Sequence, residues 1–258
     1  MSPFFCDLNI TMGHNDFTKY HPYIVNAGKH LKWLPGDTEE LYQENLVKQR
    51  DLLEKHNWLS TEIEYKFNSD GFRSEEFSSN GGGVMFLGCS LTFGIGLPLQ
   101  HTFPQIVSKE LGLECLNLSL PASSNDTAFR LTDLWIDRLN PSVVILLSPS
   151  ETRFELLIHD STSNEIEARF VTTMDQLSST TTELHWMDTD QNGQINRRKN
   201  KLAIQKICDD RGVKFLQDDT ENLVIMDLAR DLLHPGVKSN RLFAKKLLKI
   251  LKETELLC

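Results

Sequence analysis

The stretch Val84-Met-Phe-Leu-Gly-Cys-Ser-Leu-Thr-Phe-Gly-Ile-Gly-Leu97 decides the fold that we expect. Its first four residues form a short apolar run, typical of a buried strand, and Gly88-Cys-Ser90 then marks a tight turn before an amphipathic segment. A serine at the start of a helix lies beside exposed backbone N–H groups, which favour negative charge on a nearby oxygen. Ser90 is therefore a candidate nucleophile for acyl transfer. A small-residue turn that merely links a strand to a helix is the alternative interpretation.

Length and charge narrow the classes of protein. A chain of 258 residues suits one large domain, or one domain with a sizeable extension. Its net charge of −9 argues against a general nucleic-acid binder. The start, Met1-Ser-Pro-Phe-Phe-Cys-Asp7, lacks the basic and long apolar regions of a secretory signal, and no run is long enough to cross a bilayer. We expect a soluble, cytoplasmic protein that binds neither nucleic acid nor membrane, of unknown oligomeric state.

The sequence offers only weak candidates for a metal or cofactor site. The five cysteines are scattered without C-x-x-C spacing, so neither a disulfide framework nor a zinc site is expected. Cys89 adjoins Ser90 and is kept as a rival nucleophile. Asp188-x-Asp190-x-Asn192-Gly193 copies the start of a calcium loop, but Lys199 stands where a bidentate Glu is required. We expect no metal and no cofactor.

The cluster Ser78-Ser-Asn-Gly-Gly-Gly83 is the clearest break in the chain. Residues 1–78 before it form an N-terminal extension, rich in aromatic residues and with helical character over 37–56, which we expect to pack on a main domain at 79–258. The aromatic residues of the extension either line a sugar cleft or cover the edge of the sheet. Tyr23, Trp33 and Trp58 are among them.

After the break, apolar runs alternate with helical patterns. The runs predicted to be buried strands lie at 84–87, 115–118, 143–147, 213–216 and 223–226. Helices are predicted over 102–112, from a cap at Asn125 or Asp126 to 139, over 195–209 and over 239–256. This alternation predicts a parallel sheet covered on both faces, with ligands at the carboxyl ends of its strands. The polar residues 160–192 are expected to form a surface excursion near the site.

A serine nucleophile needs a base, and the base needs an orienting group. Asp231-Leu-Leu-His234 follows the fifth predicted strand. Asp and His three residues apart on a loop can bring their side chains together, so that the carboxylate fixes the imidazole tautomer. The same pattern also occurs by chance in a surface turn with a solvated Asp. Its position after the last strand of a sheet whose first strand ends at Ser90 makes it the candidate base and partner.

Three segments together resemble the SGNH (GDSL-type) hydrolases. They are Gly88-Cys-Ser90-x-Thr-x-Gly94-x-Gly96, Asp231-x-x-His234 and the upstream Asn68-Ser-Asp-Gly-Phe-Arg73. The resemblance covers about residues 66–254. It implies a flavodoxin-like three-layer α/β/α sandwich with a five-stranded parallel sheet. It also implies Ser90 as the nucleophile, His234 as the base and Asp231 as its partner.

The chain departs from this family around the oxyanion hole. The residue before the nucleophile is cysteine where the family usually has Asp. The glycine that normally donates a backbone N–H falls on Ala122, or alternatively on Ser119. Ser150 stands where the family has a donor Asn, and Asn125 is a possible substitute. The resemblance thus implies an oxyanion hole of the Ser90 and Ala122 N–H groups, with Ser150 or Asn125.

These residues predict a serine esterase or acyl hydrolase that removes small acyl groups, such as acetyl, from a carbohydrate or related small-molecule ester. Two alternatives stay open. Because the loss of one oxyanion donor lowers the rate by roughly 100- to 1000-fold, the chain could be a catalytically weak or inactive SGNH-fold module that binds glycan or serves in assembly. An acyltransferase would use the same triad with a different acceptor.

Overall fold

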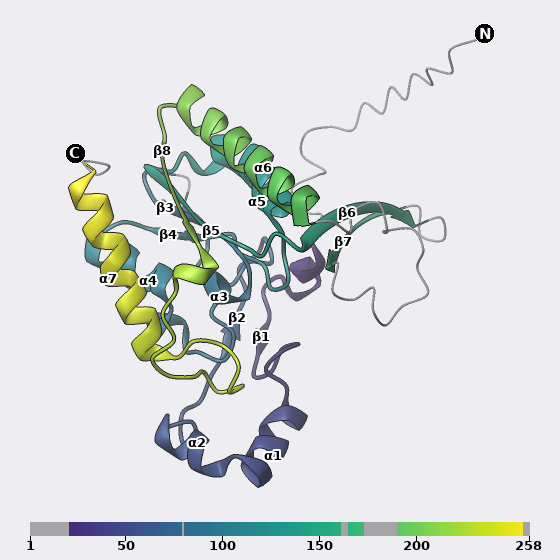
Figure 1. Cartoon of the computed structure of the whole chain (residues 1–258), viewed down its shortest axis with the longest axis vertical. Helices are drawn as coiled ribbons and strands as arrows, with labels where there is room; N and C mark the ends of the chain where they lie inside the picture. The colour runs from purple at the N-terminus through teal and green to yellow at the C-terminus, as the bar shows by residue number, and fades with distance from the viewer. Residues whose placement is uncertain (1–20, 79, 161–164, 173–189, 255–258) are drawn as a thin grey trace.

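A parallel sheet forms the centre of the molecule (Figure 1). The computed structural model describes residues 21–78, 80–160, 165–172 and 190–254. Within these residues the sheet has the strand order β4 (Cys115–Asn117), β3 (Val84–Leu87), β5 (Val143–Ser148) and β8 (Lys214–Asp219). All three strand pairs are parallel. The predicted α/β architecture is therefore confirmed, and β3 lies at the interior of the sheet.

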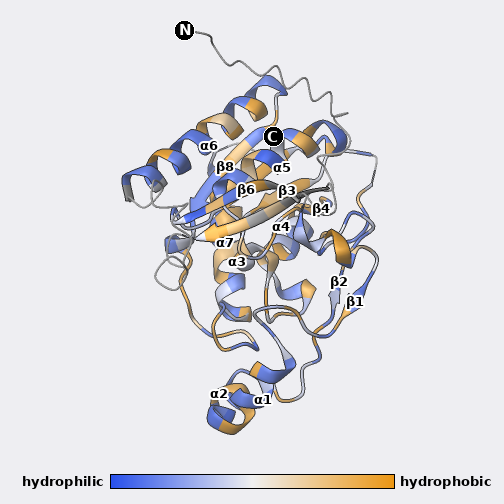
Figure 2. Cartoon of the chain, turned by 90° about the vertical axis from the view of Figure 1, so that its right-hand side faces the viewer, coloured by the Kyte–Doolittle hydropathy of each residue, from blue (hydrophilic) through white to orange (hydrophobic). Residues whose placement is uncertain are grey.

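Helices cover both faces of the sheet. The helices α4 (Phe103–Leu111) and α7 (Val237–Glu253) lie on one face, and α5 (Asn125–Leu139) and α6 (Asp190–Asp210) lie on the other (Figure 1). Because side chains alternate along a strand, Phe86 packs with Phe103 on the first face, while Met85 packs with Trp135 on the second. Figure 2 shows hydrophobic and hydrophilic residues alternating along α6, as expected for a helix with one buried side.

The prediction of a fifth strand is wrong. Residues 223–226 form no strand, and Val224, Ile225 and Met226 are 57–61% exposed. Only η6 (Thr220–Asn222) separates β8 from this run. A parallel neighbour needs a crossover connection of a dozen or more residues, so this run follows β8 too closely to pair beside it. The described sheet has four strands where five were predicted, and the three-layer arrangement is retained.

Two predicted helix starts also differ. Ser124, and not Asn125 or Asp126, caps α5 through a capping box with Thr127. The helix α6 begins at Asp190, five residues before the predicted start. The part of the calcium-like pattern from residue 190 onward is therefore helical and not a calcium loop, whereas Asp188 lies outside the described residues.

The expected surface excursion at 160–192 contains regular structure that periodicity did not reveal. The strands β6 (Arg153–Asp160) and β7 (Glu165–Thr172) form an antiparallel hairpin. Residues 161–164 and 173–189 of the excursion lie outside the described residues. The hairpin is fixed to α5, since Arg130 pairs with Glu155 (Nη2–Oε1 2.6 Å) at the start of β6.

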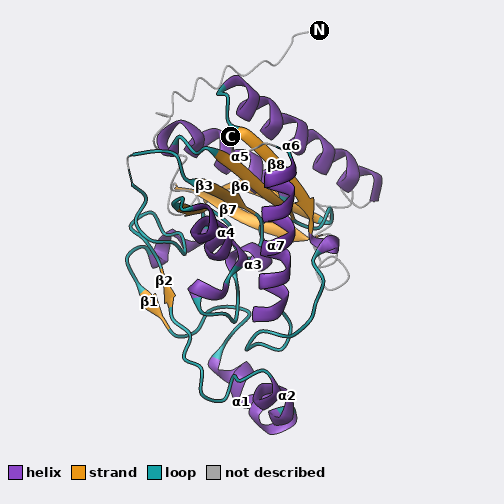
Figure 3. Cartoon of the chain, turned by 90° about the vertical axis from the view of Figure 1, so that its left-hand side faces the viewer, coloured by secondary structure: helices purple, strands orange, loops and turns teal. Residues whose placement is uncertain are grey.

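The described part of the N-terminal extension packs against the loops that follow the strands. It contains η2 (Pro22–Asn26), the paired strands β1 (His30–Leu31) and β2 (Tyr65–Lys66), and the helices α1 (Glu39–Lys48) and α2 (Arg50–Lys55). Figure 3 shows α1 and α2 at the end of the molecule away from the sheet. A third hydrophobic cluster joins Trp58 and Tyr65 of the extension to Ile95 and Leu232. The extension thus contacts both loops that carry candidate catalytic residues.

No helix in the described residues has the length and apolar character needed to span a bilayer.

Candidate active site

Ser90 is the first residue of the short helix α3 (Ser90–Phe93), and two residues, Gly88 and Cys89, separate it from the end of β3. Gly88 makes this sharp turn possible. Its φ is +151°, and a Cβ added there would lie 2.9 Å from the Leu147 carbonyl oxygen of the neighbouring strand β5. Only glycine fits such a close approach, so the serine is held at the carboxyl end of an interior strand.

Three predicted residues meet at this point. His234 Nε2 lies 2.9 Å from Ser90 Oγ, although 144 residues separate them. His234 Nδ1 is hydrogen-bonded to Asp231 Oδ2. With Nδ1–H donating to the carboxylate, Nε2 is free to accept the serine hydroxyl proton. This is the hydrogen-bonded order that a general base requires.

The Asp231 carboxylate is itself held in place. Its Oδ1 accepts the backbone N–H groups of Leu233 (3.1 Å) and His234 (3.0 Å). The residue is 2% exposed. One carboxylate oxygen therefore orders the loop while the other orients the imidazole.

Cys89 is placed differently from Ser90. Its side chain is 4% exposed, and its carbonyl accepts the N–H groups of Thr92 (3.1 Å) and Phe93 (2.9 Å). In the described part of the chain, the imidazole of His234 contacts the serine hydroxyl and no thiol. The candidate base therefore lies at the serine hydroxyl and not at the neighbouring thiol.

Ala122 lies on a turn that is fastened to the nucleophile turn. Leu120 N (3.2 Å) and Ser123 Oγ (3.0 Å) both donate to the Gly88 carbonyl. Ala122 has a φ of +64°, the left-handed region that glycine occupies without strain. Neither its N–H nor that of Ser90 donates to another described residue. Both groups are therefore available to a negatively charged oxygen.

The other proposed donors already have protein partners. Ser119 N donates to Asn117 Oδ1 (3.2 Å), which favours Ala122 over Ser119 as the backbone donor. Asn125 Nδ2 donates to a backbone carbonyl in the loop after β5 (3.2 Å) and is buried. Ser150 Oγ is hydrogen-bonded to Thr152 Oγ1 (3.0 Å). A contribution from Asn125 or Ser150 to the oxyanion hole stays a prediction.

Gly96 explains how two loops come together: the loop that follows Ser90 and the loop that carries Asp231 and His234 (the catalytic loops). Its carbonyl accepts the Arg230 N–H (3.0 Å), and a Cβ on Gly96 would lie 2.9 Å from Ala229 Cβ. The second glycine of the Gly94-x-Gly96 pair thus lets the loop bearing His234 touch the loop after Ser90.

A buried polar network that sequence reasoning missed supports this contact. Arg230 donates two hydrogen bonds to Asp37 (Nε–Oδ1 3.1 Å, Nη2–Oδ2 2.7 Å). Tyr65 OH donates to the same carboxylate (2.5 Å) and accepts the Gly96 N–H (2.8 Å). Burial and the Asp37 carboxylate raise the pKa of Tyr65, so it stays a neutral donor. The extension thereby connects both catalytic loops.

Arg73 braces the loop after Ser90 from the other side. It donates to the carbonyls of Phe93 (3.1 Å), Gly94 (2.6 Å) and Leu97 (2.5 Å), and its guanidinium lies 4.4 Å from the Tyr65 ring centroid. Burial lowers its pKa to about 10. The Asn68–Arg73 segment marked this arginine in the sequence, but only the fold reveals that it caps α3.

No group of three or more His, Cys, Asp or Glu side chains among the described residues is arranged to hold a metal ion.

Comparison with protein-family models finds no match, and comparison with curated proteins finds no relative by sequence. Several solved structures are similar to the chain. A carbohydrate esterase is 11% identical, with a TM-score of 0.44 over 67% of this chain and 65% of that one. The acetyl xylan esterase Est2A of Butyrivibrio proteoclasticus is 14% identical, with a TM-score of 0.37 over 71% and 67%. A G-D-S-L family protein of Desulfitobacterium hafniense is 12% identical, with a TM-score of 0.35 over 66% and 100%.

Proposed function

We propose that the chain is a serine ester hydrolase in which Ser90 is the nucleophile, His234 the general base and Asp231 its orienting partner. The observation that carries this proposal is the continuous hydrogen-bonded path from Ser90 Oγ to His234 Nε2 (2.9 Å) and from His234 Nδ1 to the Asp231 carboxylate. Its position at the carboxyl end of an interior parallel strand supports the same conclusion.

The geometry supports the following reaction sequence. His234 Nε2 removes the hydroxyl proton as Ser90 Oγ bonds to the acyl carbon, and the carbonyl electron pair moves onto its oxygen. The N–H groups of Ser90 and Ala122 stabilise that oxyanion. When the C–O bond to the alcohol breaks, His234 protonates the leaving oxygen. Water then attacks the acyl-enzyme by the same route, releasing the acid and restoring Ser90.

The substrate class is part of the proposal. The sequence predicts small acyl groups on a carbohydrate or related ester, and the hydrogen-bonded triad supports ester chemistry without selecting the alcohol. An acyltransferase would differ only in the second acceptor. The side chains of Asn125 and Ser150 are already hydrogen-bonded to other protein groups. A catalytically weak or inactive binding module is therefore the competing proposal.

A fluorophosphonate probe tests the proposal, because it reacts only with an activated serine. We expect the wild-type chain to be labelled and to hydrolyse p-nitrophenyl acetate, and Ser90→Ala to lose both properties. Ser142→Ala is the matched control, since this exposed serine lies at the opposite end of β5 from the site. Absence of both labelling and turnover in the folded wild type would favour the binding module. Ester formation with an added sugar alcohol faster than hydrolysis would identify a transferase.

A further inference from the structure

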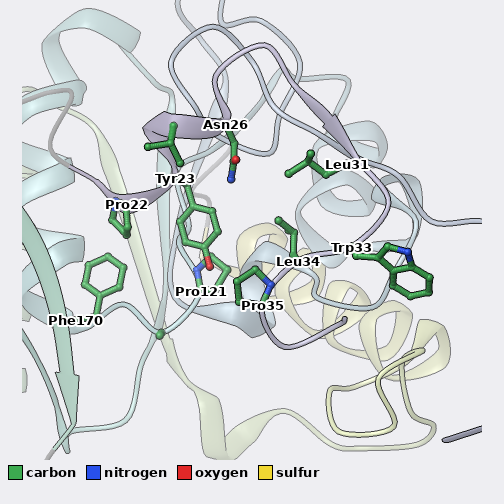
Figure 4. A pocket seen from close by; sticks show the side chains of 11 residues that line it. Pro22, Tyr23, Asn26, Leu31, Trp33, Leu34, Pro35, Pro121 and Phe170 are labelled. Atoms are coloured by element: carbon green, nitrogen blue, oxygen red, sulfur yellow. The ribbon is translucent and has the colours of Figure 1, made fainter. Parts of the chain in front are cut away.

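A cavity of about 450 Å³ lies beside Ala122 (Figure 4). Its walls come from three separate parts of the chain: the N-terminal extension, the turn before α5, and the strand β7 of the hairpin. Figure 4 shows the Tyr23 ring, which belongs to the extension, pointing toward Pro121. Phe170 of β7 lies on the hairpin side. Most of the lining residues belong to the N-terminal extension, so the cavity depends on the extension.

The lining carries no ionisable charge. Its members are Pro22, Tyr23, Val25, Asn26, Leu31, Trp33, Leu34, Pro35, Pro121, Ala122 and Phe170. Burial raises the pKa of Tyr23 to about 12, so this residue also stays neutral. The Tyr23 hydroxyl and the Asn26 amide donate to no other described side chain or backbone group. A lining of this kind favours an uncharged, mainly apolar occupant.

The cavity adjoins the site through Ala122. This residue, the proposed oxyanion donor, lines it, whereas neither Ser90 nor His234 is in its lining. The Tyr23 ring in its wall also lies 5.9 Å from Phe93, the last residue of the helix that begins at Ser90. The alcohol oxygen of an ester must face His234 Nε2 to be protonated as it leaves. With the alcohol oxygen at His234 and the carbonyl oxygen at the Ser90 and Ala122 N–H groups, the acyl chain is the substituent that remains to be accommodated elsewhere.

We propose that this cavity is the acyl pocket and that the substrates are esters of apolar acyl groups longer than acetyl. This inference rests on the proposed hydrolase function and specifies its substrate class. An acetyl methyl group occupies about 30 Å³, the volume share of a water molecule, which is less than a tenth of the 450 Å³ available. This proposal differs from the small acyl groups that the family resemblance favours, and the experiment below decides between the two.

p-Nitrophenyl acetate and p-nitrophenyl octanoate provide the test, because they share a leaving group and differ only in the acyl chain. Burial of one methylene contributes at most about fourfold to kcat/KM. The cavity is open on one side, so only part of the chain is buried. We expect kcat/KM for the octanoate to exceed that for the acetate by at least about tenfold.

Filling the cavity should reverse this preference. Asn26→Trp places a large ring where the amide now points into the cavity (Figure 4), and Pro35→Trp adds a ring at an exposed residue of the same lining. We expect the ratio of octanoate to acetate kcat/KM to fall by at least about tenfold in both variants. Val47→Trp on α1, where the side chain is 86% exposed, is the control and should leave the ratio unchanged.

A binding measurement separates the pocket from the chemistry. Octanoate and acetate are titrated calorimetrically into Ser90→Ala, with and without Asn26→Trp. We expect octanoate to bind more tightly than acetate, and the added tryptophan to remove this difference. Hydrolysis with a ratio that the filling variants do not change would overturn the acyl pocket and leave the hydrolase standing. No hydrolysis and no fluorophosphonate labelling would overturn the hydrolase, and octanoate binding sensitive to Asn26→Trp would still support the pocket.

Discussion

Arg230 and Asp37 form a buried ion pair with two hydrogen bonds, although 193 residues of chain separate them. Their side chains are 6% and 1% exposed. Arg230 directly precedes Asp231, and its backbone N–H also binds the loop that follows Ser90. The ion pair therefore joins the N-terminal extension to the catalytic loops at the residue next to the triad carboxylate.

Asp37→Asn should damage both stability and catalysis. The amide keeps the shape but leaves the Arg230 charge buried without its counter-charge, which costs about 3 kcal/mol in free energy of unfolding. We also expect kcat to fall more than KM changes, because the loop carrying Asp231 and His234 loses its anchor. Urea unfolding and ester kinetics measure the two effects. Glu40→Gln, on the exposed face of α1, is the control. A variant with unchanged kcat would limit Asp37 to a structural role.

Ala122→Gly should stabilise the protein slightly. The left-handed backbone costs an alanine about 1–2 kcal/mol, whereas the added freedom of glycine in the unfolded chain costs about 0.4–1 kcal/mol. The net effect is a gain of about 0.5 kcal/mol with activity retained, since the N–H donor is kept. The same substitution at Ala27, where φ is −48°, should destabilise. If thermal unfolding showed the same loss of stability for Ala122→Gly and Ala27→Gly, the backbone strain at Ala122 would be contradicted.

Asp231→Asn should preserve the fold and abolish most activity. The retained carbonyl oxygen can still accept the Leu233 and His234 N–H groups, so the loop keeps its shape. The amide would favour the wrong imidazole tautomer, and a loss of about 10⁴-fold in kcat is expected for such a change. Steady-state hydrolysis and the rate of fluorophosphonate labelling measure it. Asp133→Asn on the exposed side of α5 should retain full activity.

His21 should make stability depend on pH. The side chain is 3% exposed, donates from Nε2 to the Asp70 carbonyl (3.0 Å) and stacks on Phe72. Burial lowers its pKa from 6.5 to about 4. Between these values the unfolded chain binds a proton that the folded chain does not, so stability is complete above pH 6.5 and falls as pH drops toward 4.

The His21 contribution is on the order of 3 kcal/mol when fully lost. Urea unfolding at pH 7.5 and 4.5 measures it in the wild type and in His21→Phe, which keeps an aromatic ring and removes the titration. We expect the variant to lose about 2 kcal/mol less than the wild type over this interval. Identical pH slopes for the two proteins would contradict the shift.

Local patterns predicted the parts of the fold that depend on neighbouring residues. The apolar run of β3, the glycine turn and the spacing of Asp231 and His234 are short-range features, and each appears in the structure where it was expected. The run at 223–226 has the same apolar character as a strand, but the short connection after β8 leaves its last three residues exposed. Apolar character alone does not distinguish these outcomes.

The parts that could not be predicted depend on contacts distant in sequence. Nothing near Asp37 or Arg230 in the chain indicates that they pair, because neither lies in a repeating pattern. The cavity beside Ala122 likewise combines Tyr23, Pro121 and Phe170, which come from three segments. The sequence predicted the candidate catalytic residues, whereas the residues that support them are brought together only by the tertiary structure.

The link from Ser90 to His234 also has a kinetic meaning. Contacts that close loops of 144 and 193 residues raise the contact order of the chain, and such contacts tend to form slowly. Catalytic competence should therefore appear late in refolding, after most helical structure has returned. Parallel recording of far-ultraviolet circular dichroism and ester hydrolysis during dilution from urea measures this delay. Hydrolytic activity would then report when the contact between Ser90 and His234, distant in sequence, has formed during folding.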